Sequence, residues 1–138
     1  MKRIYVVYIL TAIMLSVSSC KKDEGSERFR LLTGHIWQSY ELLVDGEDAS
    51  GVGQPLEKFD GDAEFRKDGT GTFGQYEGTW YFSNNENNIT IVSTDLLVPL
   101  TTTIEELTSL SFIISTSFPI TGNPEEPNLI KISFRAKP

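Results

Sequence analysis

Few residues in this chain belong to the types that carry out catalysis or hold metals. There is one cysteine, Cys20, and one histidine, His35, among 138 residues. A catalytic triad needs a base, an acid that orients it and a nucleophile held together. A structural zinc site usually draws on several Cys and His ligands. A lone histidine is more typical of an ordinary strand residue, so we predict no catalytic residue, no metal site, no cofactor and no enzymatic activity.

The acidic residues also fail the spacing tests for calcium binding and for glycosidase chemistry. An EF-hand loop that starts at Asp60 would need glycine at its sixth position and glutamate at its twelfth, but these positions hold Phe65 and Gly71. The carboxylates of Glu105-Glu106 and of Glu125-Glu126 would point to opposite faces of a strand. Neither pair could therefore flank one glycosidic bond. A weaker cation site in the loop that starts at Asp60 stays open as an alternative.

Cys20 follows a leader-like N-terminus. Met1-Lys2-Arg3 is basic, and residues 4–17 (IYVVYILTAIMLSV) form an almost unbroken apolar run without charge. About 14 apolar residues suit a signal peptide and fall short of the roughly 20 that a spanning helix needs. The sequence Val17-Ser18-Ser19-Cys20 resembles the bacterial lipobox, which implies cleavage of residues 1–19 and lipid, including palmitate-type acyl chains, on Cys20. The alternative is an ordinary signal peptide with an incidental cysteine.

Residues 20–28 are predicted to form a lipid-anchored, flexible tether, because residues 21–27 (KKDEGSE) contain charges and no large apolar side chain. The start Cys20-Lys21-Lys22-Asp23-Glu24 resembles that of lipoproteins from Bacteroidetes-type bacteria. In those proteins, acidic residues just after the cysteine act as a signal for export to the cell surface. The resemblance implies an outer-membrane lipoprotein of the cell envelope that is exposed at the surface, with a plain tether on the periplasmic face as the alternative.

The length and charge of the mature chain restrict its partners. Without residues 1–19, 119 residues remain, which is enough for one domain with a single core. The leader takes Lys2 and Arg3 with it, so the mature chain has 10 basic and 19 acidic residues and a net charge of −9. Such a chain repels nucleic acid and offers no basic patch to anionic lipids. We expect contact with the membrane through the lipid on Cys20, and no nucleic-acid partner.

From Ile36 onward, short β-forming runs alternate with turns. Lys67-Asp68-Gly69-Thr70 contains an Asp-Gly pair, a strong hairpin signal, and residues 45–57 and 119–128 have loop compositions. A short helical turn is expected at residues 27–33. Consecutive hairpins without a helical crossover favour an all-β, eight-stranded up-and-down barrel, since closure removes exposed edges; the alternative is a two-sheet β-sandwich. The barrel domain is placed at residues 29–138, with strands at 36–44, 63–66, 70–73, 76–82, 89–93, 96–104, 110–118 and 129–136.

Several short motifs occur in an order that resembles the lipocalin-like domains of many Bacteroidetes lipoproteins, over about residues 31–135. The motifs are Leu32-Thr33-Gly34-His35-Ile36-Trp37, Phe65-Arg66-Lys67-Asp68-Gly69-Thr70, Gly78-Thr79-Trp80, Ile104-Glu105-Glu106-Leu107-Thr108 and Ile132-Ser133-Phe134-Arg135. The resemblance implies a calycin-like barrel with room for a ligand, in a family whose members mostly lack a known activity. In lipocalins, a Gly-x-Trp motif opens the first strand and an arginine of the last strand packs over that tryptophan. The corresponding structural pair here is Trp37, after the longer spacing Gly34-x-x-Trp37, and Arg135.

Seven aromatic residues on the expected strands are candidates for lining a ligand cavity. They are Trp37, Phe65, Phe73, Trp80, Phe82, Phe112 and Phe134. An eight-stranded barrel is just wide enough for side chains to fill, so a packed core is the alternative. The first functional hypothesis is a monomeric, non-enzymatic, membrane-anchored module that binds a small hydrophobic ligand. The second is a structural or interaction lipoprotein of the envelope, whose loops at 45–57 and 119–128 contact a protein or a glycan.

Overall fold

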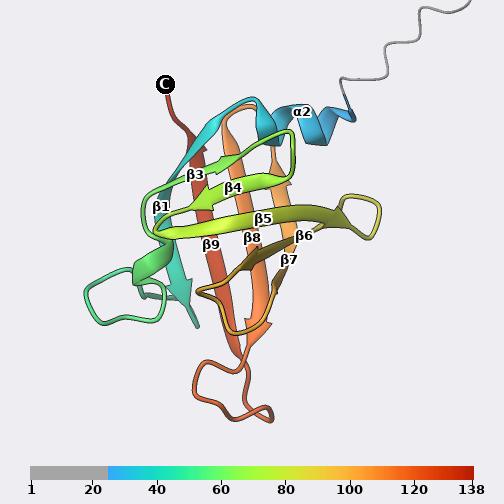
Figure 1. Ribbon diagram of the computed structural model, residues 1–138. Helices are drawn as coiled ribbons and strands as arrows, with labels where there is room; N and C mark the ends of the chain where they lie inside the picture. The colour runs from blue at the N-terminus through green and yellow to red at the C-terminus, as the bar shows by residue number, and fades with distance from the viewer. Residues whose placement is uncertain (1–24) are drawn as a thin grey trace, which may run out of the picture.

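Nine strands form one continuous antiparallel sheet that closes on itself in the computed structural model, which describes residues 25–138 (Figure 1). The leader, Cys20 and Asp23-Glu24 lie outside the described residues. Each strand of the barrel wall pairs with the next along the chain, and the last pairs back with the first, from Trp37 opposite Ala136 to Val44 opposite Ile130. The predicted all-β, eight-stranded up-and-down barrel is therefore confirmed, and a two-sheet sandwich does not form.

Eight strands make up the barrel wall, and one two-residue strand only extends the end of the first as a short hairpin. The helical turn expected at residues 27–33 is present as a helix. The elements are α2 (Glu27–Thr33), β1 (Ile36–Val44), β2 (Glu47–Asp48), the 3₁₀ helix η2 (Glu57–Phe59), β3 (Asp62–Phe65), β4 (Thr70–Phe73), β5 (Tyr76–Ser83), β6 (Asn88–Ser93), β7 (Leu100–Leu107), β8 (Ser111–Phe118) and β9 (Asn128–Ala136), with β2 as the short extra strand.

The largest difference from the expected strands is at β7. The sequence predicts a strand over residues 96–104 and a turn after it, whereas β7 runs over Leu100–Leu107. Pro99 has no backbone N–H to donate, so strand pairing begins only after it. A bulge between Ile104 and Glu106 then lets the strand continue past the expected turn. Residues 94–99 consequently form a loop at one end of the barrel.

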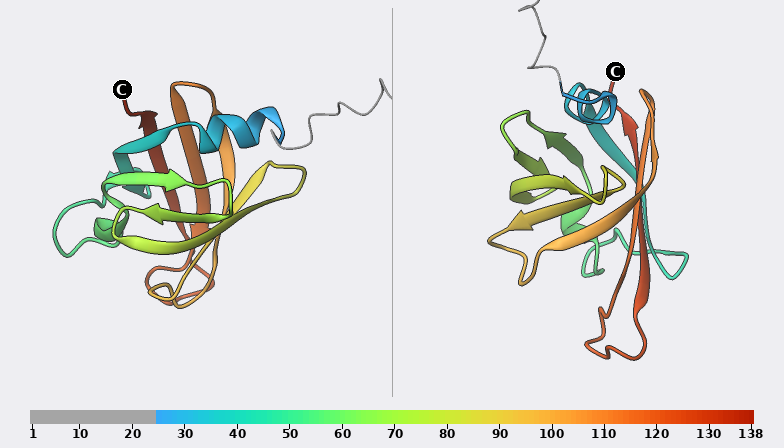
Figure 2. Two further views of the ribbon diagram at one scale, coloured as in Figure 1. Left: turned by 45° about the horizontal axis from the view of Figure 1, so that its top comes forward. Right: turned by 90° about the vertical axis from the view of Figure 1, so that its right-hand side faces the viewer.

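Helix α2 lies across one end of the barrel, next to both β3 and β7 (Figure 2). Leu32 of this helix is fully buried, and its backbone carbonyl accepts a hydrogen bond of 3.0 Å from the indole Nε1–H of Trp37. The tight turns β3–β4, β5–β6 and β7–β8 are at the same end. We call this the closed end, because a helix covers it and a tryptophan is anchored beneath the helix.

The beginning of α2 is fixed by capping and by a contact to the β5–β6 turn. The Ser26 hydroxyl accepts from the backbone N–H of Phe29 at 3.1 Å, which caps the helix. The Nε–H of Arg28 donates to the backbone carbonyl of Glu86 at 2.9 Å. Because Glu27 and Arg28 belong to the helix, these two residues are not part of a flexible tether, and the tether predicted over the preceding residues stays a prediction.

The opposite end carries the longer connections, and we call it the mouth. In an up-and-down barrel every second connection falls at the same end, which here gathers residues 45–61, 74–75, 94–99 and 119–127. Figure 2 shows α2 at one end of the barrel and the long β8–β9 loop at the other. The strands that close the barrel and the buried residues of its described core all lie within residues 25–138. We therefore expect this segment to fold as a unit.

Candidate functional site

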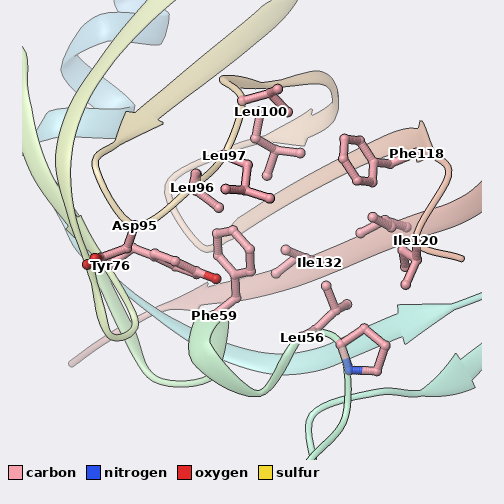
Figure 3. A pocket seen from close by; sticks show the side chains of 13 residues that line it. Leu56, Phe59, Tyr76, Asp95, Leu96, Leu97, Leu100, Phe118, Ile120 and Ile132 are labelled. Atoms are coloured by element: carbon pink, nitrogen blue, oxygen red, sulfur yellow. The ribbon is translucent and has the colours of Figure 1, made fainter. Parts of the chain in front are cut away.

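A cavity of about 370 Å³ opens at the mouth of the barrel (Figure 3). Its walls come from the mouth-side ends of β5, β7, β8 and β9, and from the β1–β3, β6–β7 and β8–β9 loops. Apart from Tyr76 and Asp95, the lining residues are apolar, and in Figure 3 the Asp95 carboxylate is directed away from the cavity. The lining residues are Pro55, Leu56, Phe59, Tyr76, Asp95, Leu96, Leu97, Val98, Leu100, Phe118, Ile120, Ile130 and Ile132.

The β1–β3 loop is held against the barrel wall and so forms a fixed side of the cavity. The backbone N–H of Ala49 donates to the Leu42 carbonyl of β1 at 2.8 Å, and the N–H of Leu56 donates in turn to the Ala49 carbonyl at 3.0 Å. The N–H of Gln75 donates to the Lys58 carbonyl at 2.7 Å. Gly74, with a φ of 63°, makes this close approach feasible, because an added Cβ would meet the backbone of the β1–β3 loop. These contacts hold Leu56 and the adjacent η2 in place without a ligand.

Tyr76 supplies the polar group closest to the apolar walls. Its ring contacts Phe59, with centroids 4.6 Å apart, and in Figure 3 the ring extends from the wall toward Phe59. Burial of Tyr76 and the negative charge of nearby Asp95 raise the pKa of the phenol above its ordinary value of 10.0. The hydroxyl therefore stays protonated at neutral pH and can donate or accept one hydrogen bond with a bound molecule.

The aromatic residues predicted from the strands occupy the other part of the barrel interior, and none of the seven lines the cavity. Phe112 is at the centre of the cluster, with ring centroids 5.6 Å from Trp37, 5.6 Å from Phe65 and 5.5 Å from Phe134. Phe82 is partly buried and lies edge-on to Trp80 at 5.3 Å. The buried members are Trp37, Phe65, Phe73, Trp80, Phe112 and Phe134. These residues are packing residues, and the cavity is built from others.

The expected stacking of Arg135 on Trp37 is wrong. Arg135 is opposite Gln38 in the β1–β9 register, whereas Trp37 is opposite Ala136. Since neighbouring residues of a strand point to opposite faces, Trp37 faces the core while Arg135 faces solvent. The Arg135 guanidinium instead lies over the exposed ring of Tyr40, 4.3 Å from its centroid.

The remaining candidates for chemistry do not converge. His35 is partly buried and packs edge-on against Trp37, with centroids 5.4 Å apart. Glu105 and Glu106 bond separately, to the hydroxyls of Ser115 and Ser111. Among residues 25–138 no group of three or more His, Cys, Asp or Glu side chains is placed to hold a metal ion.

The cavity residues missed by sequence reasoning are mostly in loops. Leu56 and Phe59 fall in a Gly- and Asp-rich stretch whose composition suggests only a loop, yet both are buried. The run Leu96-Leu97-Val98-Pro99-Leu100 was the available signal, because five successive apolar residues are unusual in a surface loop. The sequence pattern places this whole run in the strand expected at residues 96–104, whereas Leu97 and Val98 are exposed at the rim of the cavity.

No protein-family model matches this sequence, and no curated protein gives a significant match to it. Within residues 25–138, none of the helices is long and apolar enough to cross a membrane.

Proposed function

We propose that this protein is a membrane-anchored, lipocalin-like lipoprotein that binds a small hydrophobic ligand in the mouth of its barrel, without catalysis. The observation that carries the proposal is the cavity of about 370 Å³ whose walls are apolar except for Tyr76 and Asp95. Small-molecule sites typically measure roughly 300–1,000 Å³ and combine apolar walls with a few polar groups. An eight-stranded barrel can be filled by its own side chains, so a hollow mouth beside a packed aromatic end supports a binding role.

The position of the chain start supports an orientation for this module. The first described residues, Gly25 and Ser26, precede α2 at the closed end, and the mouth is at the opposite end (Figure 2). A lipid on Cys20 would thus hold the barrel by its closed end, with the mouth directed away from the membrane. In this orientation the ligand enters from the solvent.

Ligand binding can be tested on residues 25–138 with N-phenyl-1-naphthylamine, an uncharged probe whose fluorescence rises in apolar surroundings. The proposal predicts saturable binding of one probe per barrel, and displacement by uncharged aliphatic alcohols. Native mass spectrometry of the protein from its own host should then show a co-purifying apolar molecule. A titration without saturable binding would mean that the cavity has no ligand function.

The membrane anchor can be tested separately. Cells fed an alkyne analogue of palmitate should incorporate the label into the wild-type protein and not into the Cys20→Ser variant. Because Cys20 is the only cysteine, labelling of the variant would contradict attachment at this residue.

Replacing Asp23 and Glu24 should reduce protease accessibility on whole cells if these residues direct surface export, and unchanged accessibility would rule out that role.

The second hypothesis, an interaction protein of the envelope, is favoured by one observation. Val52 and Leu97 are almost completely exposed, each on a different loop of the mouth, where a partner that covers the mouth would contact both. Cross-linking on intact cells from a residue introduced next to Val52 should then capture one specific envelope protein. If no specific protein is captured, the interaction hypothesis is wrong and only the ligand hypothesis remains.

A further inference from the structure

The cavity at the mouth offers a bound molecule one polar side-chain group and no charge. Of the described residues that line it, only Tyr76 and Asp95 have polar side chains, and none is a lysine or an arginine. The Asp95 carboxylate is directed away from the cavity, and it lies at the opposite end of the Tyr76 side chain from the hydroxyl (Figure 3). The Tyr76 hydroxyl is therefore the side-chain group with which a molecule inside the cavity can form a hydrogen bond.

Tyr76 is held in place by its ring, while its hydroxyl has no partner in the protein. The residue begins β5 at the mouth, and its ring packs against Phe59 with centroids 4.6 Å apart. In Figure 3 the hydroxyl is at the end of the ring next to Phe59. The indole N–H groups of Trp37 and Trp80, in the packed part of the barrel, donate to backbone carbonyls. By contrast, the Tyr76 hydroxyl makes no hydrogen bond within the described part of the chain, so it is available to a ligand.

A neutral hydroxyl suits an uncharged ligand better than a charged one. Because burial and the charge of Asp95 raise the pKa of Tyr76, the hydroxyl is protonated at neutral pH and can donate to an uncharged oxygen. A carboxylate or an ammonium head would lose its hydration inside the cavity without gaining an oppositely charged side chain there. One neutral hydrogen bond does not offset that cost. Charged heads should therefore remain in solvent at the opening, where they forgo the bond to Tyr76.

We propose that the cavity selects an uncharged hydrophobic molecule with one oxygen that accepts a hydrogen bond from Tyr76, such as an aliphatic alcohol, ketone or ester. The apolar body of this molecule packs among Leu56, Leu100 and Ile130. This inference rests on the proposed function, because it specifies the ligand class of the same cavity. It excludes fatty acids, anionic lipids and alkylamines as the preferred ligands, although their chains would suit the apolar walls.

The test compares 1-decanol, decanoate and decylamine, which share one alkyl chain length and differ in the charge of the head. Each is titrated against bound N-phenyl-1-naphthylamine on residues 20–138 with Cys20→Ser, at neutral pH and physiological salt. We expect 1-decanol to displace the probe at a concentration about fivefold lower than either charged ligand, because only the alcohol places its oxygen beside Tyr76. Equal or stronger displacement by decanoate or decylamine would overturn the inference.

The variant Tyr76→Phe removes the hydroxyl and keeps the ring against Phe59. After correction for the affinity of the probe in each variant, it should weaken 1-decanol about fivefold and each charged ligand less than about twofold. The matched control is Tyr81→Phe on the same strand, which should keep the wild-type affinities, because Tyr81 is exposed on the outer face. Unchanged affinity for 1-decanol in Tyr76→Phe would overturn the inference while leaving ligand binding intact. Failure of the probe to bind saturably to the wild-type barrel would instead remove the proposed function.

Discussion

The closed end and the mouth of this barrel are built from the same alternating strands, yet one is filled and the other is hollow. Near the closed end the inward positions of the strands hold large rings, with Phe112 in contact with both Trp37 and Phe65. Toward the mouth, β7 and β9 hold smaller aliphatic residues such as Leu100 and Ile130. The packed end is therefore the one where rings contact one another, and the hollow end is lined mostly by aliphatic side chains.

The largest expected effect is on stability, at the filled end. Phe112→Ala should lower the free energy of unfolding by about 3–5 kcal/mol, because a fully buried ring leaves a cavity that its neighbours fill only in part. Urea unfolding of residues 25–138 measures the change. If this variant does not fold, Phe112→Leu should show a smaller loss. An unchanged urea concentration at the midpoint of unfolding would mean that the aromatic cluster does not form the tightly packed half of the barrel.

Filling the hollow end should affect binding rather than stability. Leu100→Trp places a larger side chain against the cavity, so affinity for N-phenyl-1-naphthylamine should fall at least about tenfold, or 1.4 kcal/mol. Leu110→Trp is the matched control, because Leu110 is exposed in the β7–β8 turn at the closed end. Equal losses in both variants would show that the probe does not bind at the mouth.

The carboxylate of Asp45 joins two segments at the mouth, which predicts that the stability of the fold depends on pH. Hydrogen bonds from the Leu129 N–H and the Asn128 amide hold the pKa of Asp45 below its ordinary value of 3.8. A depressed pKa in the folded state stabilises the protein above that ordinary value, and the contribution is lost as pH falls through the folded-state pKa. Asparagine tolerates the left-handed backbone of this position (φ 52°) and carries no charge, so Asp45→Asn should melt at a lower temperature than wild type at neutral pH. A gap between the melting temperatures that persists in strong acid would contradict this cause.

The smallest effect is expected at the rim. Leu97 is fully exposed, so Leu97→Ser should change the free energy of unfolding by no more than about 0.5 kcal/mol. Its effect on probe affinity should also be weaker than that of Leu100→Trp, because Leu97 would contact a probe in the cavity only from the rim. A large loss of stability would show that this side chain packs against the barrel.

The barrel could be predicted from sequence, whereas the cavity could not, for a physical reason. Alternating apolar residues and the Asp68-Gly69 turn are local signals, and each strand pairs with its sequence neighbour, so local signals suffice. The cavity depends on Leu56, Phe59 and the segment 96–98, whose positions follow from loop packing rather than from strand periodicity. The predicted Trp37–Arg135 pair was wrong for the same reason, because the β1–β9 register decides whether these two side chains point to the same face of the sheet.

The most direct test of a filled end and a ligand-binding mouth is a methyl NMR titration of residues 25–138 with N-phenyl-1-naphthylamine. The structure predicts saturable shifts at the methyl groups of Leu56, Leu100 and Ile130, which line the cavity. Leu32 and Leu107, buried near the closed end, should stay nearly unchanged. Shifts centred on the closed end, or no saturable shift at any methyl group, would contradict the assignment of the mouth as the ligand site.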